Sequence, residues 1–317
     1  MASKQSQRVD RYWKTVRQSS VDPQPDDLVS NAQWDVLTGE PGGVDYREID
    51  AGGVPALWAV PHGTAQDGPV LLCFHGGGYI GGSMFTHRKM FAHLAKAISA
   101  RALVVDYTLV PQGGTFPRPT GEGVTTYQWL LDQGIPAGRI AFAGDSAGGH
   151  LAMTVQLRAR AQGLPLPVAT MLLSPWIDFA VTGGSLDYNE GKDLIFTKQW
   201  ITGMAAGFLN GHDPRDPAAG PLHADLSGFG PIYIHVGDQE LLLDDSRMLA
   251  KHARQSGVDV QLDEFPDQQH SFQMAAGLAP EADDSISRFA AWARPRLGLA
   301  EPAAESPNGR SAAAALT

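Results

Sequence analysis

Residues 144–148 read Gly-Asp-Ser-Ala-Gly, which places a serine between two glycines. The residues just before them, Ile140–Ala143, resemble a short buried strand, and those from Gly149 to Arg160 have the pattern of a helix. So tight a turn strains the backbone at its centre, and larger side chains beside the serine would clash. The G-x-S-x-G pattern in this setting predicts a nucleophilic Ser146, whose hydroxyl projects from the end of a sheet at the start of a helix. The competing interpretation is a helix N-cap that happens to be rich in Ser and Gly.

A serine hydroxyl is a weak nucleophile until a base removes its proton. His270 stands in "FPDQQHSF", directly after the last apolar run of the strand type. The chain order of serine, acid and histidine then matches that of a hydrolase triad on an α/β fold. We therefore predict His270 as the base, the alternative being an exposed loop histidine.

The acid that orients the histidine should follow the apolar run Ile232–Val236, where the sequence reads "GDQELLLDD". Asp244 and Asp245 are expected to begin the next helix, where acidic side chains suit the helix dipole. The residue pattern leaves Asp238 and Glu240 both open as the orienting acid.

Acyl transfer also needs N–H donors for the developing oxyanion. In "LLCFHGGGYIGGS" a strand ends near His75 and three glycines follow, so their N–H groups can approach a substrate oxygen closely. The N–H of Ala147, directly after the serine, is the other expected donor. A phosphate-binding loop is disfavoured because the G-x-x-x-x-G-K-[ST] lysine is missing.

The elements that must position these residues alternate between strands and helices, which predicts an α/β fold with a mostly parallel sheet. The expected strands are Val70–Phe74, Ala102–Asp106, Ile140–Ala143, Val168–Leu173, Ile232–Val236 and Val258–Phe265. The expected helices are Thr86–Ala100, Gly121–Gln133, Ala147–Gln162, Asp244–Gln255 and Ala282–Arg294. Residues 44–60 predict an antiparallel hairpin at the sheet edge.

Two segments fall outside this alternation. Residues 1–40 form a polar, helix-capable lead-in, and residues 178–225 are too long for a plain connection between strands. We expect the latter to hold helices packed over the carboxyl end of the sheet, the alternative being one crossover helix with a long loop. The catalytic domain is expected to span residues 41–298, and residues 299–317 are expected to be disordered.

Composition excludes several classes of protein. The 317 residues carry a net charge of −10, which disfavours a nucleic-acid or anionic-membrane partner. The single cysteine, Cys73, lies in an apolar run and is expected to be an inert core residue. No apolar stretch approaches the roughly 20 residues that cross a bilayer, and no signal peptide is evident at the N-terminus. These features favour a cytoplasmic protein.

Together, the motifs "HGGGYIGGS" and "GDSAGGHLA" resemble those of the hormone-sensitive-lipase-like (HSL) esterases, a family of α/β hydrolases. "DYTLVPQGGTFP" and "LSPWIDF" are similar to further segments of that family, and the resemblance covers roughly residues 45–298. It implies an α/β-hydrolase fold with a helical cap formed by residues 1–40 and 178–225. A weaker similarity of residues 40–61 to a lactone-hydrolase subgroup widens the expected substrates.

The resemblance also implies a role for each site residue. It matches the nucleophile to Ser146, the base to His270, and the oxyanion donors to Gly76, Gly77 and Ala147. The family's acid motif D-P-L-R-D is replaced here, and aligning its second aspartate on Asp244 puts the acid at Glu240 rather than Asp238.

The predicted activity is hydrolysis of short- to medium-chain esters or lactones, without metal or cofactor. An amidase, an acyltransferase or a non-catalytic binder on the same fold are the alternatives. The predicted partner is a small ester or lactone substrate. Neither a nucleic acid nor a membrane is expected as a partner, and the sequence does not decide between a monomer and a homodimer.

Overall fold

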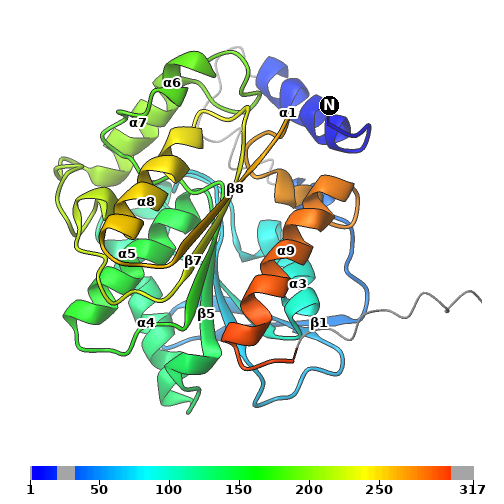
Figure 1. Ribbon diagram of the computed structural model, residues 1–317, viewed down its shortest axis with the longest axis vertical. Helices are drawn as coiled ribbons and strands as arrows, with labels where there is room; N and C mark the ends of the chain where they lie inside the picture. Colours follow the sequence, from blue (N-terminus) through cyan, green and yellow to red (C-terminus); the bar gives the residue numbers. More distant parts are fainter. Residues whose placement is uncertain (1, 20–32, 301–317) are drawn as a thin grey trace, which may run out of the picture.

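One eight-stranded sheet, in the order β1-β2-β4-β3-β5-β6-β7-β8, forms the centre of the molecule (Figure 1). The structure is a computed structural model and describes residues 2–19 and 33–300. Strand β2 runs antiparallel to both of its neighbours, and the pairings from β4 to β8 are all parallel. The strands are β1 (Val44–Asp50), β2 (Pro55–Pro61), β3 (Val70–Phe74), β4 (Arg101–Val105), β5 (Ile140–Asp145), β6 (Ala169–Leu173), β7 (Ile232–Gly237) and β8 (Val260–Phe265). The predicted parallel sheet with a hairpin at its edge is confirmed.

Helices cover both faces of the sheet, α3 and α9 on one face and α4, α5 and α8 on the other (Figure 1). The α-helices are α1 (Ser6–Ser19), α3 (Met84–Ile98), α4 (Arg118–Asp132), α5 (Ala147–Ala161), α6 (Ser185–Tyr188), α7 (Lys198–Leu209), α8 (Leu243–Gln255) and α9 (Pro280–Arg296). Short 3-10 turns are η1 (Gln33–Leu37), η2 (Val110–Gln112), η3 (Ala137–Arg139), η4 (Pro221–His223) and η5 (Phe272–Ala275).

Side chains of β3 alternate between the two cores. Leu72 and Phe74 pack with the core on the side of α4 and α5, whereas Leu71 and Cys73 pack with the core on the side of α3 and α9. All four are fully buried, as expected for a parallel strand covered on both faces. The prediction that Cys73 is a core residue is confirmed.

Helix α3 begins two residues earlier than predicted because Ser83 caps it. The Ser83 hydroxyl accepts the N–H groups of Phe85 and Thr86 at 3.2 Å each, and Thr86 Oγ1 accepts the N–H of Ser83 at 2.9 Å. This is a capping box that satisfies N–H groups otherwise unpaired at a helix start. The predicted strands differ from the observed ones by at most two residues at either end, because the pattern of apolar residues carries little information on boundaries.

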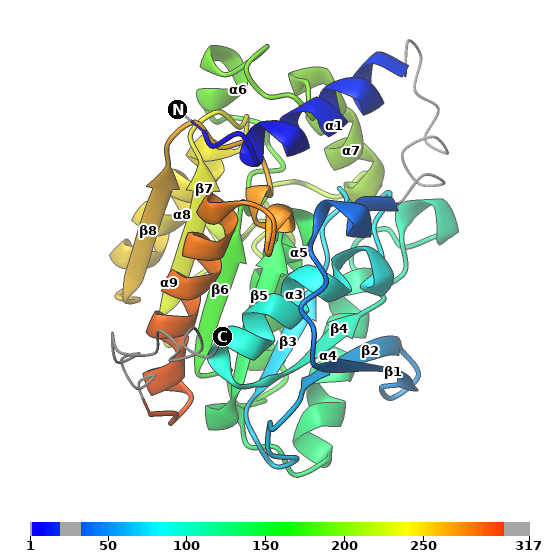
Figure 2. The same ribbon diagram turned by 90° about the vertical axis from the view of Figure 1, so that its right-hand side faces the viewer.

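Among the described elements, helices α1, α6 and α7 lie beyond the carboxyl ends of the parallel strands (Figure 2). Helix α1 lies near the N-terminus, and α6 and α7 belong to the segment between β6 and β7. Helix α7 begins after Thr197, whose hydroxyl accepts the N–H of Trp200, and it buries Ile201 and Phe208. This is the end of the sheet at which β5 leads into α5, so these helices lie over the predicted nucleophile.

Two predicted segments lie partly outside the described residues. Of the lead-in 1–40, residues 1 and 20–32 are outside, and of the predicted disordered tail, residues 301–317 are outside. The first tail residues, Leu299 and Ala300, both form hydrogen bonds with Arg294.

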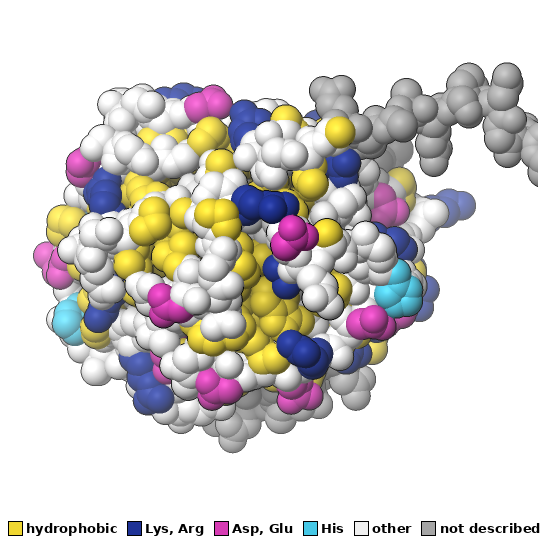
Figure 3. Space-filling model, turned by 90° about the horizontal axis from the view of Figure 1, so that it is seen from below, with side chains coloured by type: hydrophobic (Ala, Val, Ile, Leu, Met, Phe, Trp, Pro, Cys, Tyr) yellow, Lys and Arg dark blue, Asp and Glu magenta, His cyan; other side chains and the backbone are white. Residues whose placement is uncertain are grey.

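Charged side chains of both signs are interspersed on the face shown in Figure 3, around a group of hydrophobic side chains. Within residues 2–19 and 33–300, no helix combines the length and hydrophobicity required to cross a membrane.

Candidate active site

Ser146 lies at the turn from β5 into α5 with φ 52° and ψ −119°, a conformation that costs a non-glycine residue about 1–3 kcal/mol. Its backbone N–H is held by Leu173 O of the neighbouring strand at 2.9 Å. A Cβ atom at Gly144 would collide with the carbonyl of Gly148, and one at Gly148 with the carbonyl of Phe74. The predicted steric need for both glycines is therefore confirmed.

His270 lies in the loop after β8 and contacts Glu240 in the turn after β7. Its Nδ1 is 2.7 Å from Glu240 Oε2, and both side chains are buried. Because an ionised carboxylate only accepts hydrogen bonds, this contact places the imidazole proton on Nδ1 and leaves Nε2 as an acceptor. Asp238 instead accepts the N–H of Asp267 at 2.8 Å and the Gln239 side chain at 2.7 Å. Of the two acids left open, the structure brings Glu240 to the histidine.

The other oxygen of Glu240 is also held. Oε1 accepts the N–H of Gly237 at 2.7 Å and the hydroxyl of Ser174 at 2.8 Å. Ser174 Oγ in turn accepts the N–H of Ser271, the residue after the histidine, at 3.1 Å. One hydroxyl thus ties the acid to the histidine loop, and the carboxylate cannot rotate without breaking several bonds.

The pKa of His270 is raised above its ordinary value. Burial by itself lowers this pKa, because it disfavours the charged imidazolium. The charge and hydrogen bond of Glu240, followed by the charges of Asp145 and Asp193, outweigh that effect. The site therefore stabilises a positive charge on His270, which a histidine acquires when it accepts a proton.

The geometry corrects the predicted set of oxyanion donors. The N–H of Gly76 donates to His87 Nε2 at 3.1 Å and is therefore occupied. For the N–H groups of Gly77, Gly78 and Ala147, the described parts of the chain supply no acceptor. Gly77 lines the same pocket as Ser146, and a Cβ at Gly78 would come within 2.5 Å of Met204 Sδ, another pocket residue.

The pocket above Ser146 also contains His270 and is otherwise mainly apolar. It has an empty volume of about 640 Å³, including space open to solvent. Large side chains come from α1 (Trp13), from η1 (Trp34), from the segment before α7 (Ile195, Phe196) and from α7 itself (Trp200, Met204). The ring of Phe196 meets the His270 ring edge-on at 5.0 Å between centroids.

Sequence reasoning missed three buried groups around this site: Ser174, Asp193 and His87. Ser174 stands in the quoted segment "LSPWIDF", so its neighbourhood was noticed but not its role. No local sequence motif marks Asp193 or His87. Asp193 bonds Leu241, which is distant in the sequence, and His87 bonds Gly76 across a loop.

Comparisons with known proteins agree with this architecture. A family model described as alpha/beta hydrolase fold matches residues 71–274. An acetyl-hydrolase of Streptomyces hygroscopicus is 36% identical over 250 residues, 79% of this chain and 83% of that protein. An esterase of Acinetobacter venetianus is 33% identical over 232 residues, 72% of this chain and 76% of that protein.

Solved structures are similar as well. The crystal structure of an esterase from the bacterial hormone-sensitive lipase family is 37% identical, with a TM-score of 0.88, covering 94% of this chain and all of that one. The chain belongs to the α/β-hydrolase family. Its structural neighbours are esterases of the HSL group, which confirms the resemblance noted in the sequence, and its relatives support an ester hydrolase.

Proposed function

We propose that this protein hydrolyses carboxylic esters of short to medium chain length, or lactones, with Ser146 as nucleophile, His270 as base and Glu240 as the acid that orients it. One observation carries the proposal: the pocket that contains the strained Ser146 also contains His270, whose Nδ1 is bonded to Glu240. Strained backbone at the serine and a buried carboxylate at the histidine are both needed for this chemistry and are costly otherwise.

In the acylation step, His270 Nε2 takes the proton of the Ser146 hydroxyl while the oxygen attacks the ester carbonyl. The carbonyl oxygen becomes negative, and the N–H groups of Gly77, Gly78 and Ala147 stabilise it. The imidazolium then gives its proton to the leaving alcohol oxygen, and an acyl-serine remains. In a lactone the alcohol stays attached to the acyl group.

In the deacylation step, His270 takes a proton from a water molecule whose oxygen attacks the acyl-serine. The second tetrahedral intermediate collapses, the proton returns to Ser146, and the carboxylic acid leaves. Throughout both steps Glu240 keeps the imidazole in the Nδ1–H tautomer and balances its positive charge.

The substrate range follows from the pocket walls. Trp13, Trp34, Phe196 and Trp200 offer apolar surface, which suits neutral acyl or alcohol groups of moderate size. We propose that residues 1–40 and 178–225 together form a cap that provides these walls and limits access to the pocket.

The decisive test is Ser146→Ala, assayed on p-nitrophenyl acetate and butyrate. We expect kcat to fall by about 10⁴-fold or more, because the nucleophile is lost. Ser287→Ala is the matched control. This exposed serine on α9 donates its hydroxyl to Asp283 O within its own helix, so the activity of the variant should be unchanged. A folded Ser146→Ala protein that keeps most of its activity would overturn the proposal.

A further inference from the structure

The segment just before α7 is bonded to both loops that carry the acid and the base. Towards the acid, Asn189 Nδ2 donates to the carbonyls of Glu240 at 2.9 Å and Asp238 at 3.0 Å. Towards the base, the side chain of Gln269 accepts the N–H of Leu194 at 2.9 Å and donates to Lys192 O at 3.1 Å. The pocket wall and the catalytic loops are therefore one hydrogen-bonded unit.

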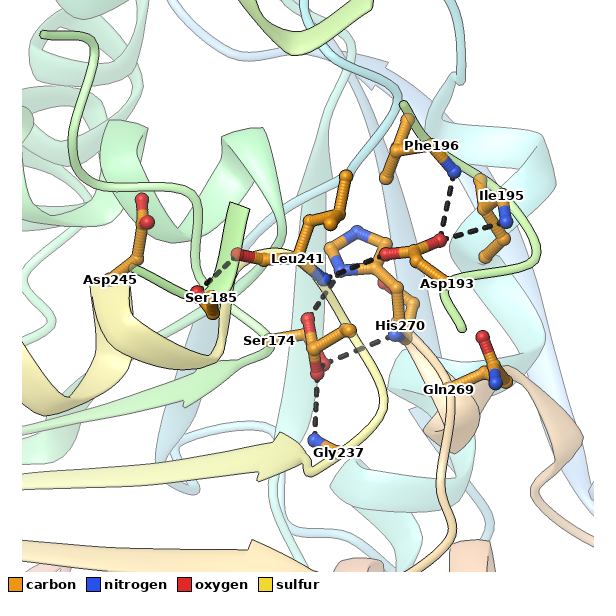
Figure 4. Close-up of polar contacts among 12 residues, drawn as sticks. Ser174, Ser185, Asp193, Ile195, Phe196, Gly237, Leu241, Asp245, Gln269 and His270 are labelled. Atoms are coloured by element: carbon orange, nitrogen blue, oxygen red, sulfur yellow. Dashed lines mark hydrogen bonds and ion pairs between the residues drawn. The ribbon is translucent and has the colours of Figure 1, made fainter. Parts of the chain in front are cut away.

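Asp193 is the centre of this unit (Figure 4). Its Oδ1 accepts the N–H groups of Ile195 and Phe196, both at 2.8 Å, and its Oδ2 accepts the N–H of Leu241 at 2.9 Å. Ile195 and Phe196 line the pocket, and Leu241 directly follows Glu240. A single, fully buried carboxylate thus fixes a stretch of pocket wall and the turn that holds the acid.

The same carboxylate lies beside the imidazole of His270 (Figure 4). His270 faces three carboxylates from three different elements: Glu240 after β7, Asp145 at the end of β5, and Asp193 before α7. Burial raises the pKa of Asp193 above its ordinary value, and the charge of His270 and the three N–H donors partly offset this. The three N–H donors and the imidazolium stabilise a negative charge on Asp193, and that charge in turn stabilises a positive charge on His270.

We propose that Asp193 is a positioning residue that joins substrate selection to catalysis, because it holds the wall at Ile195 and Phe196 and the turn at Leu241 in one arrangement beside His270. This inference rests on the proposed ester hydrolysis by Ser146 and His270. A substitution of Asp193 should therefore change both the shape of the pocket wall and the surroundings of His270.

The test is Asp193→Asn, which keeps the volume but removes the charge and one acceptor oxygen. kcat/KM is measured against pH for p-nitrophenyl acetate and hexanoate. We expect the acid limb to move to lower pH, by up to about one unit, since a negative charge beside His270 is lost. We also expect the hexanoate-to-acetate ratio of kcat/KM to change by about tenfold, because the wall shifts.

The matched control is Asp187→Asn, a charge removal in the same segment. Asp187 is exposed and pairs with Lys198, so both the acid limb and the chain-length ratio should stay as in the wild type. A folded Asp193→Asn enzyme with an unchanged acid limb, or with an unchanged chain-length ratio, overturns the inference.

If circular dichroism shows that Asp193→Asn does not fold, Asp193→Glu decides alone. This variant keeps the charge but lengthens the side chain by one methylene, so the acid limb should stay while the chain-length ratio changes. A wild-type ratio, or a moved acid limb, contradicts the inference. A Ser146→Ala variant that hydrolyses the same esters as fast as the wild type would instead count against the proposed function.

Discussion

His270 and His150 are both buried near Ser146, yet their surroundings shift their pKa values in opposite directions. His150, on the first turn of α5, lies among Tyr79, Phe179 and Phe208; its Nδ1 accepts the Tyr79 hydroxyl at 2.7 Å and its Nε2 donates to Ala219 O at 2.6 Å. Burial lowers the pKa of His150 to about 4, although the bond to Ala219 opposes this.

Among the residues that the structure describes, no carboxylate is bonded to His150, whereas Glu240 is bonded to His270 and raises its pKa. The comparison shows that burial alone makes a histidine a neutral structural group. A buried histidine becomes suited to accept a proton where a carboxylate accompanies it.

The sharpest way to break the comparison is Glu240→Gln, which leaves His270 buried without its carboxylate. We expect kcat to fall by about 10³–10⁴-fold, because the amide neither balances the imidazolium nor enforces the Nδ1–H tautomer. Glu240→Asp should lie between this variant and the wild type, since it keeps the charge but shortens the reach. The measurement is kcat on one short-chain ester, with circular dichroism to verify folding.

Asp238→Asn is the control for this experiment, because Asp238 bonds the Asp267 N–H and not the histidine. Its kcat should stay near that of the wild type. A crippled Asp238→Asn enzyme beside a nearly normal Glu240→Gln enzyme would show that the acid has been assigned to the wrong residue.

Removing residues 1–40 should sharpen the comparison, because it opens the pocket that contains His270. Trp13 and Trp34 line the pocket, and Trp13 is buried, so we expect a loss of stability of about 3 kcal/mol or more. Activity should fall by about 10²-fold for larger esters and less for acetates. Melting curves and a chain-length series check this; unchanged results in both would show that the segment is only a tail.

The pH dependence of kcat/KM reports the charge on His270 in the free enzyme. The base must be neutral to act, and its pKa is raised, so activity should be lost as the pH falls through a value above 6.5. A rate profile on a neutral ester measures this limb directly. A limb well below 6.5 would mean that burial outweighs the carboxylates, as it does at His150.

The smallest effect on activity is expected from His150→Gln. Loss of the bonds to Tyr79 and Ala219 should lower the free energy of unfolding by about 1–3 kcal/mol, with kcat changed by less than about tenfold. Because the folded-state pKa of His150 lies near 4, its contribution to stability is present above pH 6.5 and is lost as the pH falls towards 4. Urea unfolding of the variant and the wild type at pH 7 and pH 5 tests both statements, since the difference should shrink at pH 5 if His150 is involved.

Features of the fold and site that depend on local sequence could be predicted. The parallel strands follow from apolar runs such as Val70–Phe74, and the need for glycine at 144 and 148 follows from the sterics of one turn. Glu240 could be preferred over Asp238 only through the family resemblance, because both follow the same strand within three residues.

Features that depend on contacts between distant segments could not be predicted. Asp193 bonds Leu241 across 48 residues, and Ser174 bonds Glu240 across 66, and no periodicity or motif encodes such pairs. The role first assigned to Gly76 failed for a similar reason, since the ring of His87 on α3 takes up its N–H. Local geometry predicts which groups are available, but only the packed fold shows which of them are already bonded.

The backbone at Ser146 has a consequence for how this protein can evolve. Its φ of 52° is in the range that glycine occupies without strain, so the serine lowers the stability of the fold for as long as it is present. A substitution to glycine would relieve this strain, so the serine is retained only by selection for its hydroxyl. A lineage released from that selection should therefore lose its activity and gain stability in the same substitution.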